Sequence, residues 1–127
     1  MLEDKVKELA KGRNFALVTT LMPDGTPQTL PLWVDADDDH VLINTEVGRQ
    51  RYKNLQRNPK VTVLIVEDGN WYSFAEVRGH LDGEITGDEA RTHIDALSHK
   101  YTGADYANPI QTERVVLKIA PDRQLVR

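Results

Sequence analysis

Six runs of the sequence have the β-branched and aromatic composition of strands, and a chain with so many strands must protect the edges of its sheet. The runs are residues 15–21, 28–34, 40–45, 60–66, 71–85 and 113–120. The turn-forming residues 22–26, Met-Pro-Asp-Gly-Thr, predict a hairpin between the first two strands. Closing a sheet on itself removes exposed edges. The sequence therefore predicts a mainly β fold, a small closed barrel of six antiparallel strands with peripheral helices.

Three of the expected strands have distinctive features. Pro31 has no N–H to donate, so the second strand should lie at an edge, contain a bulge or open towards a ligand. Gly79 lies inside the long fifth strand, where glycine is typical of a bulge or a tight bend. The run 60–66 is rich in β-branched residues, and we expect it to be buried on both faces.

Three segments have the signals of helices. The first, residues 2–10, ends near Gly12, and the second begins near Arg49 and is stopped by Pro59. The third follows a capping Thr86 or Asp88. Its apolar positions, which keep a helical phase, are Ala90, Ile94, Leu97 and Tyr101.

Composition narrows the possible functions. A chain of 127 residues is expected to form one domain over residues 1–127. Its net charge of −4 argues against general nucleic-acid binding, which needs a basic face. The absence of cysteine excludes disulfides, thiolate metal sites and cysteine nucleophiles. Because no stretch has the length of a membrane span and the first residues lack a signal-peptide pattern, we expect a cytoplasmic protein without membrane partners.

A basic segment directly after the third expected strand is the best candidate for binding an anion. Arg49, Arg51 and Lys53 place three cations within five positions of an acidic chain. If a helix begins near Arg49, the free N–H groups of its first turn and these side chains converge, which suits a phosphate. The alternative is a solvated helix face that binds nothing in particular, which is the commoner fate of basic clusters.

No catalytic or metal-binding constellation can be read from the sequence. The histidines, at positions 40, 80, 93 and 99, lack the spacing of a metal site or of a nucleophile and its base. The acidic run formed by Asp35 and residues 37–39 is expected to be a solvated turn. We therefore expect neither catalytic side chains nor metal ligands, which suits an enzyme whose cofactor carries the chemistry.

Three segments of the chain resemble a known family. They are Leu30-Pro31-Leu32-Trp33-Val34, then Leu42-Ile43-Asn44-Thr45, then Gly48-Arg49-x-Arg51-x-x-Asn54-Leu55-x-x-Asn58-Pro59-x-Val61. Their order and spacing resemble the pyridoxamine-5′-phosphate-oxidase-like split β-barrel superfamily. Within it the chain is most similar to the deazaflavin (coenzyme F420)-dependent oxidoreductases, the flavin/deazaflavin oxidoreductase B group. The resemblance covers nearly the whole chain, including the run 114–121.

The resemblance implies a homodimer of six-stranded split barrels with two cofactor sites in the grooves between the subunits. The cofactor ring would lie along the second and third strands, and its phosphate at the basic segment. The residues that the family motifs assign to the cofactor are Leu30, Pro31 and Trp33 beside the ring, Asn44 and Thr45 at the ring or ribityl chain, and Arg49, Arg51 and Asn54 at the phosphate, with Lys53 as an additional cation. The family usually has lysine at the position of Arg51, and arginine keeps the charge but changes the geometry of its hydrogen bonds.

The cofactor that the resemblance implies is F420, used as a hydride donor to a conjugated small-molecule substrate. Its phosphodiester and carboxylates suit cations that spread along a groove, as the basic segment does out to Arg57. FMN, with one phosphate, is the alternative cofactor. An FMN enzyme of the pyridoxamine-phosphate-oxidase type would need a second phosphate cluster, and the sequence shows none near Arg78 or Arg114. A non-catalytic protein that binds flavin, deazaflavin or tetrapyrrole is the third possibility.

Two aromatic positions each have two interpretations. Trp33 either contacts the cofactor ring or is an ordinary barrel-core or dimer-interface aromatic. Tyr72 follows Trp71 after a tight turn, so it either reaches into the cofactor groove of the other subunit or packs locally at the hairpin end.

Overall fold

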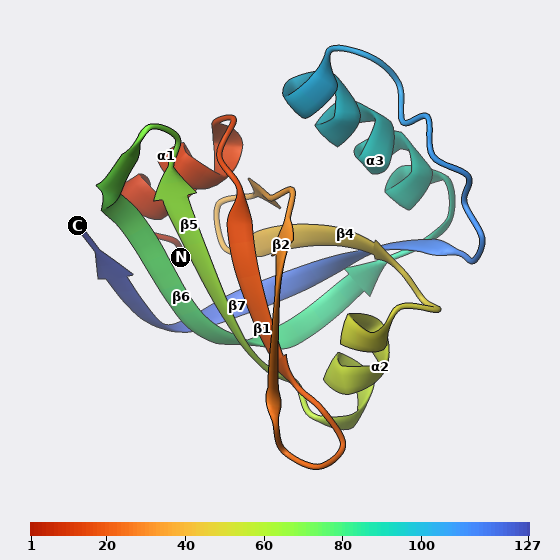
Figure 1. The fold of residues 1–127 in the computed structure, drawn as a ribbon, viewed down its shortest axis with the longest axis horizontal. Coiled ribbons are helices and arrows are strands. Elements are labelled where there is room, and N and C mark those ends of the chain that lie inside the picture. Colours follow the sequence, from red (N-terminus) through yellow and green to blue (C-terminus); the bar gives the residue numbers. More distant parts are fainter.

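The computed structural model describes residues 1–127 as one antiparallel sheet that curls around its own core (Figure 1). The strands are β1 (Ala16–Leu21), β2 (Pro27–Leu32), β3 (Asp35–Ala36), β4 (Val41–Glu46), β5 (Lys60–Glu67), β6 (Asn70–Ile85) and β7 (Arg114–Val126). The helices are α1 (Asp4–Lys11), α2 (Gln50–Arg57) and α3 (Gly87–Thr102). Neighbouring strands follow the order β2-β1-β5-β6-β7-β4-β3. The mainly β split-barrel class is thereby confirmed.

The sheet differs from expectation in that it does not close. Its two edges, β2 and β3, are not hydrogen-bonded to each other. Both edges are protected by other means, because β3 has only two residues and β2 contains Pro31, which lies opposite Leu17 of β1. The edge position predicted for Pro31 is confirmed. The prediction that the sheet closes fully into a barrel is wrong.

The seventh strand, β3, lies in the acidic run that we expected to be a solvated turn. Asp35 is half-buried, with one carboxylate oxygen 3.1 Å from Nζ of Lys11 and the other 3.0 Å from Nε2 of His93. Residues 37–39 do form an exposed turn. The expectation for Asp35 was wrong because its ion partners come from α1 and α3, which are distant in the sequence.

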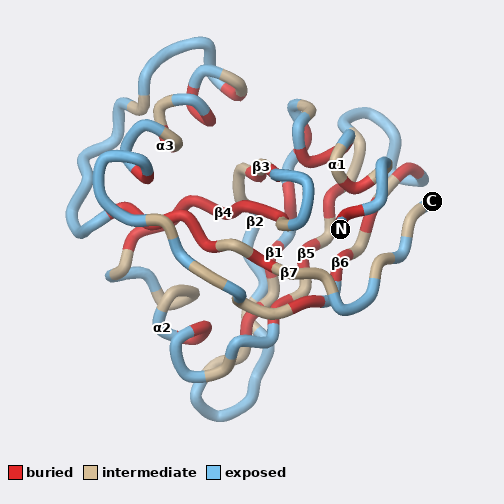
Figure 2. The backbone as a smooth tube through the Cα atoms, turned by 180° about the vertical axis from the view of Figure 1, so that it is seen from behind, coloured by how far each residue is buried: buried red, intermediate tan, exposed pale blue.

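The core consists mainly of residues of the curled sheet, joined by residues of α1 and by Leu55 of α2. Figure 2 shows the buried stretches of the backbone along these elements. The largest wholly buried ones are Ile43, Ile65, Leu117 and Ile119. In β5 only alternate residues are buried, such as Val63 and Ile65, so burial on both faces was wrong. The reason is that an antiparallel sheet of this kind packs one face on the core and leaves the other at the surface.

The three helices lie where the sequence predicts them, and none of them is long and apolar enough to span a membrane. The four predicted apolar positions of α3 are all buried. Ile94, Leu97 and Tyr101 form a cluster of their own with Trp33 and Tyr106, separate from the main core. Helix α3 therefore covers one end of the sheet through a small apolar layer.

The predicted irregularity at Gly79 is confirmed as a shift of register between β6 and β7. A Cβ atom placed on Gly79 would lie 2.1 Å from the carbonyl oxygen of Ala120. Only glycine permits this approach, which lets the two longest strands bend together.

We predict that Gly79→Ala lowers the free energy of unfolding by about 1–3 kcal/mol, because the Ala120 backbone has to move. Urea denaturation followed by tryptophan fluorescence measures the change. The matched control is Gly83→Ala in the same strand, whose Cβ would meet only Lys118 Cδ at 3.6 Å. This control should change stability by no more than about 0.5 kcal/mol. Equal effects of the two substitutions would contradict the role given to the close approach.

Candidate functional site

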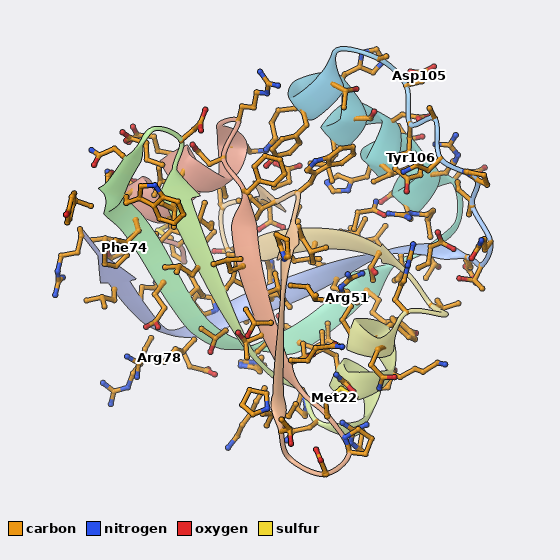
Figure 3. All side chains as sticks on the ribbon, viewed as in Figure 1. Met22, Arg51, Phe74, Arg78, Asp105 and Tyr106 are labelled. Atoms are coloured by element: carbon orange, nitrogen blue, oxygen red, sulfur yellow. The ribbon has the colours of Figure 1, made fainter.

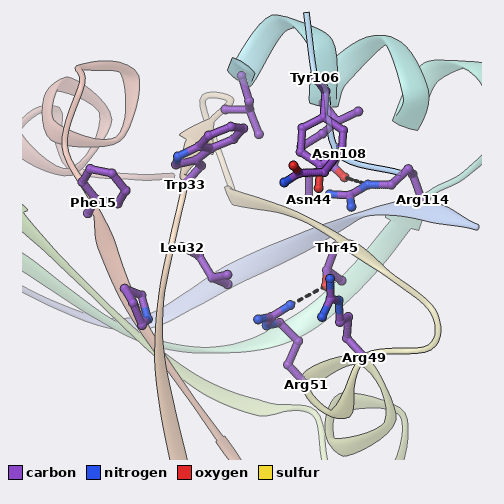
Figure 4. A pocket seen from close by; sticks show the side chains of 13 residues that line it. Phe15, Leu32, Trp33, Asn44, Thr45, Arg49, Arg51, Tyr106, Asn108 and Arg114 are labelled. Atoms are coloured by element: carbon purple, nitrogen blue, oxygen red, sulfur yellow. Dashed lines mark hydrogen bonds between the residues drawn. The ribbon is translucent and has the colours of Figure 1, made fainter. Parts of the chain in front are cut away.

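A cavity of about 350 Å³ lies between the edge strand β2, strand β4 and helix α3, where the sheet fails to close (Figure 4). Its lining residues are Phe15, Pro31, Leu32, Trp33, Asn44, Thr45, Arg49, Arg51, Ile94, Leu97, Tyr106, Asn108 and Arg114. Apolar groups come mainly from the chain around β2 and from α3, and polar groups from β4, β7 and the start of α2. The cavity therefore has two chemically different walls.

The apolar wall is built on Trp33, which is held between two tyrosines. Its ring stacks on Tyr101 with a centroid distance of 5.2 Å and meets Tyr106 edge-on at 6.2 Å. The hydroxyl of Tyr101 accepts a hydrogen bond from the backbone N–H of Val34, which locks the stack to the chain after β2. A rigid aromatic wall of this kind suits a flat, conjugated ligand.

The polar wall carries cations at the start of α2. Nη1 of Arg51 donates a 2.7 Å hydrogen bond to Oγ1 of Thr45, and no carboxylate pairs with Arg49 or Arg51. Burial, and then the positive charges of Arg49 and Arg114, lower the pKa of Arg51. Because the three guanidinium groups repel one another, an anion bound among them would be favoured.

Arg114 is a lining residue that sequence reasoning considered and did not assign. It begins β7 opposite Glu46 of β4, and its Nη1 lies 3.3 Å from Oε2 of that buried carboxylate. Its Nε donates to Oδ1 of Asn44 at 2.9 Å, and its guanidinium lies over the ring of Tyr106. Glu46 thus neutralises Arg114, whereas Arg49 and Arg51 keep their charge for a ligand.

Six of the ten predicted site residues line the cavity. They are Pro31, Trp33, Asn44, Thr45, Arg49 and Arg51. Figure 3 shows Arg51 on the same side of the molecule as Tyr106. Arg78, near which the sequence showed no phosphate cluster, lies on the opposite side.

The other four predicted residues do not line the cavity of this chain. Asn54 is wholly buried, and its amide donates to Thr20 of β1, so it attaches α2 to the barrel instead of facing a phosphate. Lys53 is exposed on α2, and Leu30 is partly exposed on β2. Tyr72, 89% exposed, projects from the end of the β5–β6 hairpin.

Seven lining residues were missed by sequence reasoning. They are Phe15, Leu32, Ile94, Leu97, Tyr106, Asn108 and Arg114. Ile94 and Leu97 were expected only as the apolar face of a helix. Tyr106 and Asn108 lie in a loop without periodicity, which the backbone N–H of Tyr106 ties to Asp95 of α3. No local signal could have placed that loop over the cavity.

Comparison with known proteins finds a family model and several solved structures that match nearly the whole chain. Residues 2–125 match the family model of pyridoxamine 5′-phosphate oxidase. A solved F420 reductase is 24% identical, with 98% of each chain covered and a TM-score of 0.83. A candidate pyridoxamine 5′-phosphate oxidase from Listeria innocua is 20% identical, with 99% of this chain and 98% of that chain covered and a TM-score of 0.72. A haem storage protein from Vibrio cholerae is 14% identical, with 98% and 94% covered and a TM-score of 0.67.

We predict that Glu46→Gln destabilises the protein by about 3 kcal/mol at pH 7, because it leaves the buried Arg114 without its counter-charge. Burial raises the pKa of Glu46, but hydrogen bonds from Thr112 and Gln111 and the charge of Arg114 lower it overall. The stabilisation is therefore complete above the ordinary glutamate value of about 4.3 and is lost as the pH falls through the depressed value. Denaturation at pH 7 and at pH 3 should show the variant approaching the parent in acid.

The matched control for this variant is Glu76→Gln, which breaks the more exposed pair between Glu76 and Arg78. Surface pairs contribute about 0–1 kcal/mol. If Glu46→Gln were as mild as this control, the buried pair would not be what anchors Arg114.

Proposed function

Because the chain belongs to the pyridoxamine 5′-phosphate oxidase family, we propose that it is an oxidoreductase that binds the deazaflavin coenzyme F420 in this cavity and reduces a conjugated small molecule. The superfamily that the sequence segments resembled is thereby confirmed. The observation that carries the proposal is the pairing of a stacked aromatic wall with two arginines that have no acidic partner.

The residues present fit a flat ring with an anionic tail. Trp33, held by Tyr101 and Tyr106, offers an apolar surface for the ring. Arg49 and Arg51 lie at the first turn of α2, where the helix dipole also favours negative charge. Burial, and then the repulsion from Arg49 and Arg114, lower the pKa of Arg51, and a phosphate there would offset the repulsion.

The protein's contribution to such a reaction is binding, orientation and exclusion of water. The deazaflavin, when bound, supplies the hydride. Ile94 and Leu97 of α3 cover the apolar part of the cavity, and Asn44 and Thr45 present polar atoms beside it. No acid–base pair is required of the protein, since the cofactor carries the difficult chemistry.

F420 is preferred to FMN for two reasons. The match to a solved F420 reductase extends over 98% of both chains, and the cations that line the cavity come from two elements, α2 and β7. FMN remains the second candidate, because Arg114 is neutralised by Glu46 and the two remaining arginines suffice for one phosphate.

Titrating the protein with F420, FMN and haem, then adding electron acceptors to the bound form, tests the proposal. Haem binding without reductase activity would favour the carrier interpretation instead.

We also propose that the protein is a homodimer. Exposed apolar residues gather on the β1 side of the barrel and at the β5–β6 turn, where Trp71 is 79% exposed and Phe15 is 58% exposed. Phe15, Leu17 and Trp71 line one hollow there, and Phe15 also lines the cavity. A second copy that covers this surface would reach the mouth of the cavity.

We predict that Arg51→Ala weakens binding of F420 about tenfold or more, because a charge-assisted hydrogen bond contributes roughly 1.5–3 kcal/mol. Arg49→Ala should act similarly, and the loss should shrink in high salt. Cofactor fluorescence measures the dissociation constant.

Two controls accompany the arginine variants. Lys53→Ala removes a cation from the same helix that does not line the cavity, and it should leave affinity unchanged. A deazaflavin fragment without the phosphate should bind parent and Arg51→Ala equally. If Arg49→Ala and Arg51→Ala both bind intact F420 as the parent does, the basic segment is a solvated face.

We predict that sedimentation at micromolar concentration gives twice the 14.4 kDa chain mass. Tyr72→Ala should weaken cofactor binding without unfolding the protein, because the side chain is exposed and would reach the partner's groove. A monomeric parent would contradict the dimer. A dimeric Tyr72→Ala variant with unchanged affinity would assign Tyr72 to local packing at the hairpin end.

A further inference from the structure

The side-chain amide of Asn44 is held on three sides behind the cavity wall. Its Nδ2 donates to the carbonyl oxygen of Ala90 at 3.0 Å and lies 3.0 Å from Nδ1 of His93, both on α3. Its Oδ1 accepts the 2.9 Å hydrogen bond from Nε of Arg114. Asn44 is 8% exposed and lines the cavity, so its orientation decides which atoms a ligand meets.

Two of these partners permit only one orientation of the amide. If it were flipped, Oδ1 would face the carbonyl oxygen of Ala90 and Nδ2 would face the N–H of Arg114, so neither hydrogen bond could form. Both hydrogens of Nδ2 are then committed, one of them towards His93. Nδ1 of His93 must therefore accept, and the neutral ring carries its proton on Nε2, which donates to Asp35 at 3.0 Å.

A second proton on His93 would conflict with this arrangement. An N–H at Nδ1 would point at the NH₂ group of Asn44, a donor against a donor. Relief requires that the amide turn, which breaks its hydrogen bonds to Ala90 and Arg114, or that the ring move away. The state of His93 is thus coupled to the position of Arg114 in the cavity wall.

Charged groups surround His93 from several elements. Asp35 of β3 accepts from it and is itself paired with Lys11 of α1. Burial raises the pKa of Asp35, but hydrogen bonds from His93 and the Ala36 N–H, and then Lys11, lower it to about 2, so it stays ionised.

Two more carboxylates, Asp88 and Glu89 in the first turn of α3, line the outer hollow that also contains His93. The three carboxylates would attract a protonated His93 ring, whereas the NH₂ group of Asn44 would face it donor to donor.

We propose that His93 is a positioning residue whose neutral form holds Asn44, and through it Nε of Arg114, in the ligand-binding arrangement. Its protonation turns the amide of Asn44 and breaks the hydrogen bond to Arg114, which Glu46 still anchors. The identity of the ligand rests on the function proposed above, whereas the coupling within the protein does not. Affinity for the ring of the flavin-type ligand then falls as the pH falls, by up to about tenfold for each pH unit below the titration midpoint of His93. By reciprocity, ligand binding favours the neutral ring.

The first experiment tests the coupling in the free protein, without any ligand. Nitrogen-15 NMR from pH 8 to pH 5 should show the Asn44 side-chain amide and the Arg114 Nε–H shifting with the same midpoint as the His93 ring. In His93→Asn, which keeps an acceptor oxygen for Asn44 but cannot titrate, both signals should stay constant. The matched control is His99→Asn, which removes a histidine on the same helix that pairs with Asp105 and does not contact Asn44. In His99→Asn the Asn44 and Arg114 signals should shift with pH as they do in the parent.

The second experiment measures affinity for riboflavin, which has no phosphate, because the phosphate monoester of FMN also titrates near pH 6. The parent and His99→Asn should bind more weakly as the pH falls, and His93→Asn should bind with the parent's pH 8 affinity throughout. A parent-like pH dependence in His93→Asn would overturn the proposal, as would Asn44 and Arg114 signals that ignore the His93 titration. If no protein binds any flavin or deazaflavin at any pH, the proposed function fails and the NMR result alone decides the role of His93.

Discussion

The arrangement of this molecule depends on the close approach between Gly79 of β6 and the carbonyl oxygen of Ala120 of β7. These two strands are the longest, and they pair with each other along most of their length. Beyond the bend, β7 pairs with β4, while β6 pairs with β5 and through it with β1 and β2. The angle at Gly79 thus determines how β4 faces the edge strand β2. The cavity occupies the space between them, so a backbone contact between two residues that do not line it influences its width.

Sequence patterns predicted the parts of the fold that rest on local chemistry. Pro31 at an edge, the bulge at Gly79 and the buried face of α3 each follow from one residue type or one periodicity. The errors share a different cause. The half-buried Asp35 and the open sheet depend on partners that are remote in the sequence, and periodicity carries no information about them.

The candidate site divides in the same way. Asn44, Thr45, Arg49 and Arg51 lie within eight consecutive residues, so a single motif could identify them. Arg114 enters the cavity only because the pairing of β7 with β4 places it opposite Glu46. No spacing pattern could identify His93, since its partners Asp35 and Asn44 come from two different strands.

The chain is negatively charged overall but its cavity is locally cationic, so the positive potential is concentrated where an anion would enter.

The separate apolar cluster beneath α3 has a consequence for the protein's internal stability. Ile94, Leu97 and Tyr101 share no buried residue with the main core, and Nζ of Lys100 attaches the helix to the carbonyl oxygens of Ala10 and Val34 at 2.9 and 2.6 Å. Segments with few core contacts open at a lower free energy than the whole molecule. We therefore expect α3 to open more readily than the barrel, with amide hydrogens that exchange with solvent sooner than those of β5 to β7. Opening of α3 alone would uncover the cavity wall formed by Ile94 and Leu97 while the barrel beneath stays folded.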